Sequence, residues 1–162
     1  MVQARPDRQG LGVATIELVT EIKASRERCF DLSRDIDLHL RSMSRSGEKA
    51  VAGRVTGLLG PEEEVTWRAR HFGVVHLHRS RITAFDRPAH FRDSMVAGRF
   101  RRFEHDHFFT PSTSGGTRMR DVIEFESPFG ILGKLVDRLL MARYLATLVR
   151  ERNRVIKAEA ER

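Results

Sequence analysis

The sequence predicts an α+β protein in which an antiparallel sheet of six to seven strands packs against one long C-terminal helix. Two observations predict this fold class. Residues 50–126 contain six runs of strand-like composition, most of them separated by turn-forming residues. After Pro128, the apolar residues recur at the three- and four-residue intervals of an amphipathic helix.

The N-terminal part predicts a strand followed by two short helices. Residues 13–22 (VATIELVTEI) are rich in β-branched residues and alternate in part, which is typical of a strand. Ser25 is a suitable N-cap for a short helix over residues 25–32, and residues 36–43 form a second short helical stretch. Residues 1–12 are polar and contain glycine and proline, so we expect a disordered tail there and a single domain over residues 13–158.

The six later runs predict an antiparallel meander, because no helical period interrupts them. A parallel sheet would need a crossover helix between successive strands. The runs cover residues 50–59, 63–72, 74–85, 90–97, 100–109 and 117–126.

The last segment predicts one long helix from Phe129 to about Ala158, which would be ~45 Å long. This length is enough to cross the whole sheet. The apolar stripe that predicts it comprises Phe129, Leu132, Val136, Leu139, Ala142, Ala146 and Val149.

Composition excludes several classes of protein. No apolar run approaches the ~18 residues of a membrane-spanning helix. The first dozen residues lack the apolar core of a secretory signal, so we expect a cytoplasmic protein. Cys29 is the single cysteine, which excludes an internal disulfide and a thiolate-rich metal site.

The chain is basic, with 29 Lys and Arg against 22 Asp and Glu, a net charge of +7. Most of the excess is arginine spread along the chain, whereas a nucleic-acid-binding surface needs basic residues clustered on one face. We therefore expect no nucleic-acid partner. Arg99, Arg101 and Arg102 lie at a predicted hairpin tip, where they could attract an acidic headgroup or an anionic membrane, or could simply be solvated.

The strand region contains several short motifs, namely WRARHFG (67–73), RIT (81–83), PAHFRD (88–93), GRF (98–100), HDHF (105–108) and GGTRMRD (115–121). With these motifs and its order of elements, the chain resembles the SRPBCC superfamily, which includes START-related proteins, polyketide cyclases and birch-pollen-allergen-like proteins. The resemblance covers residues 13–158 and is strongest to bacterial ligand-binding or cell-division-inhibitor-like members. The resemblance implies a helix-grip fold, in which the curved sheet wraps the long helix and leaves a cavity between them.

Strand alternation then predicts which side chains face this cavity, because residues two apart share one face of a strand. His76 and His78 are assigned instead to a half-exposed face. The predicted ligand-binding residues are Val65, Trp67, Ala69, His71, Phe91, Asp93, Met95, His105, His107, Phe109, Met119, Asp121, Ile123, Leu132, Val136 and Leu139.

Four polar members of this set form a predicted quartet: Asp93, His105, His107 and Asp121. A short loop around Arg99 places Asp93 opposite His105, and the loop at residues 111–117 places Asp121 opposite His107. The quartet could be a mutually satisfied buried network, a patch that orients a ligand, an acid–base pair or a metal site. Nothing in the spacing is diagnostic of a metal, so we expect no metal, no cofactor and no assigned catalytic residue.

The favoured function is binding or carriage of a hydrophobic small molecule, such as a lipid, isoprenoid, quinone or polyketide, without turnover. One alternative is a cyclase- or aromatase-like enzyme that uses the Asp and His side chains of the quartet. The other is a basic module that contacts an anionic membrane or nucleic acid. Fold resemblance alone does not choose among them, because one scaffold can host unrelated functions.

Overall fold

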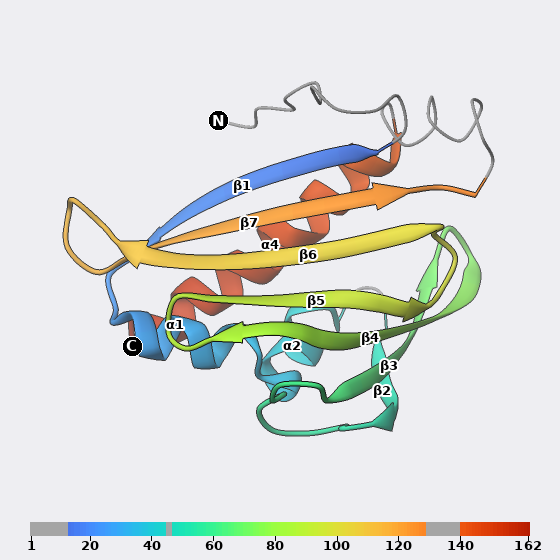
Figure 1. Ribbon diagram of the computed structural model, residues 1–162, viewed down its shortest axis with the longest axis horizontal. Coiled ribbons are helices and arrows are strands. Elements are labelled where there is room, and N and C mark those ends of the chain that lie inside the picture. Colours follow the sequence, from blue (N-terminus) through green and yellow to red (C-terminus); the bar gives the residue numbers. More distant parts are fainter. Residues whose placement is uncertain (1–12, 45–46, 129–139) are drawn as a thin grey trace.

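The computed structural model describes residues 13–44, 47–128 and 140–162 (Figure 1). The tail predicted for residues 1–12 and the predicted start of the long helix near Phe129 lie outside these residues. The described elements, in chain order, are β1 (Ala14–Ile22), α1 (Arg26–Ser33), α2 (Ile36–Ser42), β2 (Lys49–Gly53), β3 (Glu64–His71), β4 (Val74–Asp86), β5 (His90–Ala97), β6 (Arg102–Pro111), β7 (Thr117–Glu126) and α4 (Ala142–Ala160).

The strands form one seven-stranded sheet in the order β1-β7-β6-β5-β4-β3-β2, and every neighbouring pair is antiparallel. The predicted meander is therefore confirmed from β2 to β7. Among the described strands, only β1 breaks the sequential order, because it lies at the sheet edge next to β7. Two short helices after the first strand and a helix after the last complete the predicted α+β architecture.

Helix α4 runs obliquely across one face of the sheet, and α1 and α2 lie on that same side (Figure 1). Helix α4 extends beyond Val149, as predicted, and ends at Ala160. Arg28 joins α1 to the end of α4, because its guanidinium donates hydrogen bonds to the carbonyls of Glu159 and Ala160 at 2.7 and 2.9 Å. None of the described helices is long and apolar enough to span a membrane.

The short helices begin where the sequence supplies side-chain caps. Ser25 Oγ accepts a hydrogen bond from the Arg28 amide at 3.3 Å, and Asp35 Oδ1 accepts one from the Leu38 amide at 3.0 Å. Each cap satisfies an amide that has no partner within the helix. The Ser25 cap confirms the sequence interpretation, and Asp35 was not singled out.

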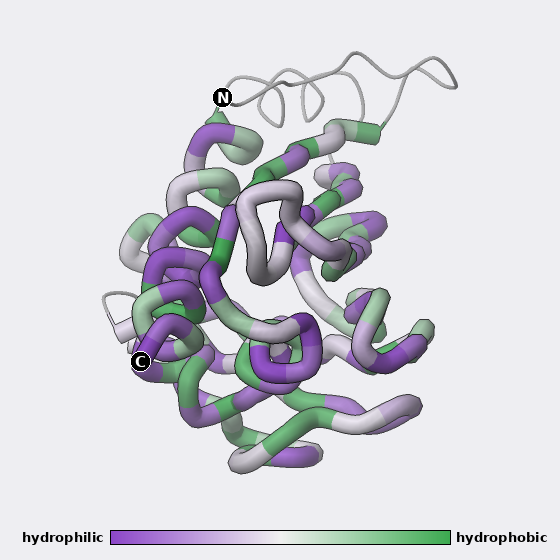
Figure 2. The backbone as a smooth tube through the Cα atoms, turned by 90° about the vertical axis from the view of Figure 1, so that its left-hand side faces the viewer, coloured by the Kyte–Doolittle hydropathy of each residue, from purple (hydrophilic) through white to green (hydrophobic). Residues whose placement is uncertain are grey.

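Alternation along the strands is visible in Figure 2, where hydrophobic and hydrophilic residues alternate along the chain. The apolar sets pack under the helices as two clusters. The larger cluster surrounds Phe30, whose ring contacts those of Phe85, Phe91 and Phe109 at centroid distances of 5.2–5.4 Å. The smaller cluster joins β1 and β7 to the N-terminal half of α4 through Ile16, Phe125 and Val149.

The first predicted strand run, residues 50–59, is longer than the strand that forms. Strand β2 ends at Gly53, whose φ of +73° is unfavourable for residues with a side chain. A Cβ atom at this position would lie 2.2 Å from the Glu64 carbonyl oxygen, so the backbone of β3 passes too closely for any other residue. Beyond this turn, Leu59 leaves the sheet and joins the larger core cluster.

Candidate functional site

A cavity of about 580 Å³ lies between the sheet and the helices. Its walls come from β3 to β7 on one side and from α2 and α4 on the other, and most of the lining side chains are apolar. Members of both core clusters contribute to its walls, among them Val65 and Phe91 of the larger cluster and Ile123 of the smaller one. A volume of this size is typical of sites for small molecules.

Nine of the predicted ligand-binding residues line this cavity: Val65, Trp67, Ala69, His71, Phe91, Asp93, His105, His107 and Ile123. They come from β3, β5, β6 and β7, and each lies on the face that alternation predicted. Leu132, Val136 and Leu139 lie outside the described residues.

Four other predicted residues lie near the cavity without lining it. Phe109 and Met119 are fully buried in the larger core cluster, because α1 covers the ends of β6 and β7. Met95 lies opposite Ser80, with its sulfur packed against Gly98 at the β5–β6 turn. Asp121 lies behind the imidazoles of His105 and His107, which separate it from the cavity.

The predicted register of the quartet is confirmed, since Asp93 stands opposite His105 and His107 opposite Asp121. Asp121 Oδ1 lies 3.0 Å from His105 Nε2 and 2.8 Å from His107 Nδ1. Asp93 Oδ2 lies 3.1 Å from His107 Nε2 but 3.9 Å from His105 Nδ1. The four side chains therefore form one connected network rather than two separate cross-strand pairs.

Asp121 is the buried centre of this network. Its Oδ2 accepts a hydrogen bond from Asn153 Nδ2 at 2.6 Å, and Arg152 Nη1 lies 3.7 Å from Oδ1. Burial by itself raises the pKa of Asp121, but the hydrogen bonds from His105 and His107 outweigh it and hold the pKa well below its ordinary value. Asp121 is therefore an ionised carboxylate in the interior.

Asp93 faces the cavity, and 22% of its side chain is exposed. Burial raises its pKa, but the hydrogen bond from His107 and the charges of both imidazoles together lower the pKa to about 2. Burial lowers the pKa of His105, with the neighbouring His107 charge acting in the same direction. The ring of Phe91 stacks on His107 at a centroid distance of 4.2 Å and fixes its plane.

A second polar group lines the cavity, and of its four members only His71 was predicted from the sequence. His39 Nε2 lies 3.4 Å from Glu48 Oε1, and His71 Nδ1 lies 2.6 Å from the Tyr144 hydroxyl. Burial raises the pKa of Glu48, but the interaction with His39 outweighs it and lowers the pKa. Neither Glu48, next to β2, nor Tyr144, on α4, lies in a pattern that marks an inward position.

His76 and His78, assigned to a half-exposed face, are indeed only partly buried, but both side chains also line the cavity, which was not predicted. Burial lowers the pKa of His78. A signal for His78 was present in the sequence, because a two-residue turn at Phe72-Gly73 pairs His71 with Val74 and hence Trp67 with His78. Both turn residues have positive φ, +51° and +78°, as this tight hairpin requires.

The three arginines of the β5–β6 hairpin differ in their surroundings. Arg101 pairs with Glu126, and Arg102 pairs with Glu104 and Glu124. Arg99 lines the cavity. The positive charge of the hairpin is therefore partly neutralised by acidic side chains on β6 and β7.

Solved structures show the same fold. The Zhui aromatase/cyclase from Streptomyces sp. R1128 aligns with a TM-score of 0.72 at 12% identity, over 93% of this chain and 94% of its own. A START superfamily protein from Mycobacterium smegmatis aligns with a TM-score of 0.66 at 11% identity, over 91% and 97% of the two chains. A protein from Thermus thermophilus gives a TM-score of 0.66 at 22% identity, over 90% and 99%.

No curated protein matches the sequence significantly. A family profile described as polyketide cyclase/dehydrase and lipid transport matches residues 13–161, nearly the whole chain. The antiparallel sheet, the two helices after β1 and the C-terminal helix reproduce the helix-grip fold of the solved relatives. The chain therefore belongs to the polyketide cyclase/dehydrase and lipid transport family of the SRPBCC superfamily.

Proposed function

We propose that this protein binds a hydrophobic small molecule of the lipid, isoprenoid, quinone or polyketide class in the cavity between the sheet and α4. The observation that carries the proposal is the cavity itself, about 580 Å³ with largely apolar walls and a polar cluster on β5 and β6. Small-molecule sites commonly combine such walls with a few polar groups that fix the orientation of the ligand. Asp93, His105 and His107 would receive the polar end of the molecule.

A cavity-filling variant tests this proposal. Ala69 lines the cavity on β3 and is 7% exposed, so Ala69→Phe places a ring in the space that the ligand would occupy. The matched control is Ala97→Phe, at an exposed position outside the cavity. We expect an apolar fluorescent probe to bind the wild type and the control, and to bind Ala69→Phe at least ~10-fold more weakly.

Native mass spectrometry of the purified protein provides an independent readout, because a co-purified ligand adds mass that organic extraction removes. Equal probe binding by Ala69→Phe and the wild type, with circular dichroism showing that both are folded, would refute the proposal. Loss of binding in both variants would point to general destabilisation, which thermal melts detect.

A second candidate is an acid–base enzyme of the cyclase or aromatase kind. It is favoured by one observation, the contact of the buried His107 imidazole with carboxylates at both ring nitrogens, 2.8 and 3.1 Å away. An imidazole held in this way can give or take a proton at the wall of a cavity. Mass spectrometry of a reactive poly-β-ketone incubated with the protein separates the candidates, since a carrier returns the compound unchanged.

A further inference from the structure

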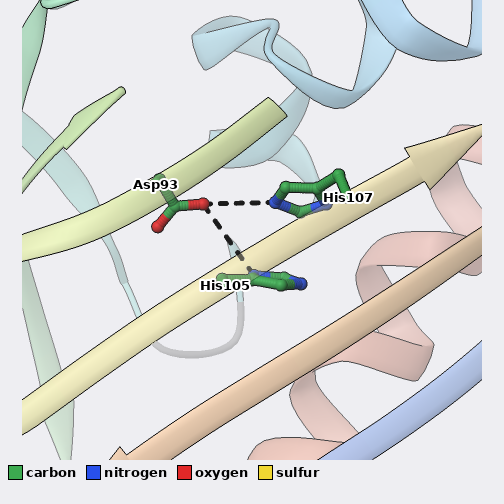
Figure 3. Close-up of side chains that lie close together, drawn as sticks. All are labelled: Asp93, His105 and His107. Carbon is green, nitrogen blue, oxygen red and sulfur yellow. Dashed lines mark hydrogen bonds and ion pairs between the residues drawn. The ribbon is translucent and has the colours of Figure 1, made fainter. Parts of the chain in front are cut away.

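The side chains of Asp93, His105 and His107 bring one potential metal-ligand atom each to within 4.8 Å of the others (Figure 3). Figure 3 shows the Asp93 carboxylate on β5 directed toward both imidazoles, which project from β6 on the same face. Two imidazoles and one carboxylate on rigid neighbouring strands form a donor set that suits divalent first-row transition metals.

Asp121 determines which nitrogen of each imidazole is available. An ionised carboxylate only accepts hydrogen bonds, so His105 Nε2 and His107 Nδ1 donate to Asp121 Oδ1. In a neutral imidazole the other nitrogen then carries a lone pair. These nitrogens, His105 Nδ1 and His107 Nε2, lie 3.9 and 3.1 Å from Asp93 Oδ2.

Three electron-pair donors therefore lie within 4.8 Å of one another at the cavity wall. Two acceptors 3.1 Å apart, such as His107 Nε2 and Asp93 Oδ2, repel unless a cation lies between them. That cation is either a proton, which would make His107 an imidazolium, or a metal ion. The third donor, His105 Nδ1, favours a metal. A proton shared by His107 Nε2 and Asp93 Oδ2 would not also bind His105 Nδ1, whereas a metal ion can bind all three donors.

We propose that Asp93, His105 and His107 bind one divalent transition-metal ion of the Zn²⁺ or Co²⁺ type, with its remaining coordination positions open to the cavity. Asp121 is the outer carboxylate that orients both imidazoles, and Asn153 holds Asp121 in turn. Metal-binding histidines almost always have such a partner on the second ring nitrogen. The inference does not depend on the proposed ligand, because the metal can bind to the empty cavity.

Two of the three distances between ligand atoms are already close to those of a metal site, and the third, between the two imidazoles, is at most 4.8 Å. Bonds of about 2.0–2.2 Å from a metal to nitrogen and oxygen place neighbouring ligand atoms about 3.0–3.5 Å apart. The contact between His107 and Asp93 already has this length, and His105 must approach Asp93 by roughly half an ångström. A metal with an open position acts as a Lewis acid and polarises a carbonyl oxygen of a bound molecule.

The test uses tag-free protein, stripped with a chelator and titrated with Zn²⁺ by calorimetry and with Co²⁺ by visible ligand-field absorption. We expect one ion per chain, a Kd in the micromolar range or tighter and a rise in Tm. Asp93→Asn should fold, because the new amide can donate to His107 Nε2, but it should weaken metal binding at least ~10-fold. His105→Ala should also weaken binding and alter the Co²⁺ spectrum.

The matched control is His90→Ala. His90 contacts Asp106 at 2.6 Å across the same two strands, but on the opposite face of the sheet. This variant should bind metal as tightly as the wild type. Absence of stoichiometric binding by the folded wild type would overturn the inference, and so would unchanged binding by Asp93→Asn. Apolar-probe binding is measured on the metal-free protein, so failure of the metal site leaves the proposed function independently testable.

Discussion

His107 and Asp121 stand directly opposite each other on β6 and β7, and 2.8 Å separates His107 Nδ1 from Asp121 Oδ1. Both side chains are about 1% exposed. A charge in such a place is stable only when it is paired and hydrogen-bonded, and Asp121 has partners on β6 and α4. Through its hydrogen bond from Asn153, Asp121 therefore also joins the sheet to the C-terminal helix.

Replacing Asp121 by Asn should destabilise the fold by about 3–5 kcal/mol, because it removes the charge that both imidazoles and Arg152 face. Chemical denaturation monitored by circular dichroism measures this difference. The control is Glu124→Gln on the same strand, where the carboxylate is 39% exposed and pairs with Arg102. That change should cost no more than about 1 kcal/mol, and equal costs for the two variants would contradict the buried network.

Acid should lower the free energy of unfolding, because it protonates Asp93. Its pKa is about 2 in the folded protein against an ordinary 3.8, so the ionised form stabilises the fold above pH 3.8. This contribution, about 2 kcal/mol, is lost as the pH falls from 3.8 toward 2. Denaturation of the wild type and Asp93→Asn should therefore show a difference in unfolding free energy that narrows over this range.

The control for the acid experiment is Asp86→Asn, which changes an exposed carboxylate at the end of β4. Its difference in unfolding free energy from the wild type should stay small, because the side chain is exposed. A gap between the wild type and Asp93→Asn that widened in acid would give the opposite sign and show that Asp93 is not stabilised as the anion.

The aromatic centre of the larger core cluster should be the most sensitive apolar position. Phe30 is fully buried and contacts three other phenylalanine rings, so Phe30→Ala should cost about 3–5 kcal/mol through lost burial and an unfilled cavity. Phe72→Ala, at a hairpin position that is 71% exposed, should change stability by about 0.5 kcal/mol or less. Thermal and chemical melts of both variants check this contrast.

Alanine substitutions at two adjacent glycines in the β6–β7 turn distinguish the cost of backbone strain from the cost of steric overlap. Gly115 and Gly116 have φ values of +86° and +84°, so alanine at either position should cost about 1–2 kcal/mol. At Gly116 the added Cβ would also lie 2.2 Å from the Ile22 carbonyl oxygen, whereas nothing lies within 4 Å at Gly115. Gly116→Ala should therefore cost at least ~1 kcal/mol more than Gly115→Ala. Equal melting temperatures would exclude this close approach of the turn to the end of β1.

The cavity-lining residues that were not predicted show which features of the site the sequence alone does not determine. His78 could have been placed, since the Phe72-Gly73 turn determines its pairing with Trp67. Glu48 and Tyr144 could not, because they reach the cavity only through the packing of the β2 end and α4 around it. Packing by other elements also explains why Phe109, Met119 and Asp121, which were predicted to line the cavity, do not line it. Alternation gives the face of a strand, but it does not say which part of that face another element covers.

The sequence by itself determined the antiparallel sheet, the helix after it and the strand register that places Asp93 opposite His105 and His107 opposite Asp121. These features depend on short-range properties, namely the two-residue period of strands and the lengths of the connecting turns. Only the tertiary structure decided that Asp121 contacts both imidazoles and that Asp93 lies closer to His107 than to His105. Those contacts, and the volume of the cavity, depend on side-chain rotamers and on the distance between α4 and the sheet, which are set by packing between residues far apart in the chain.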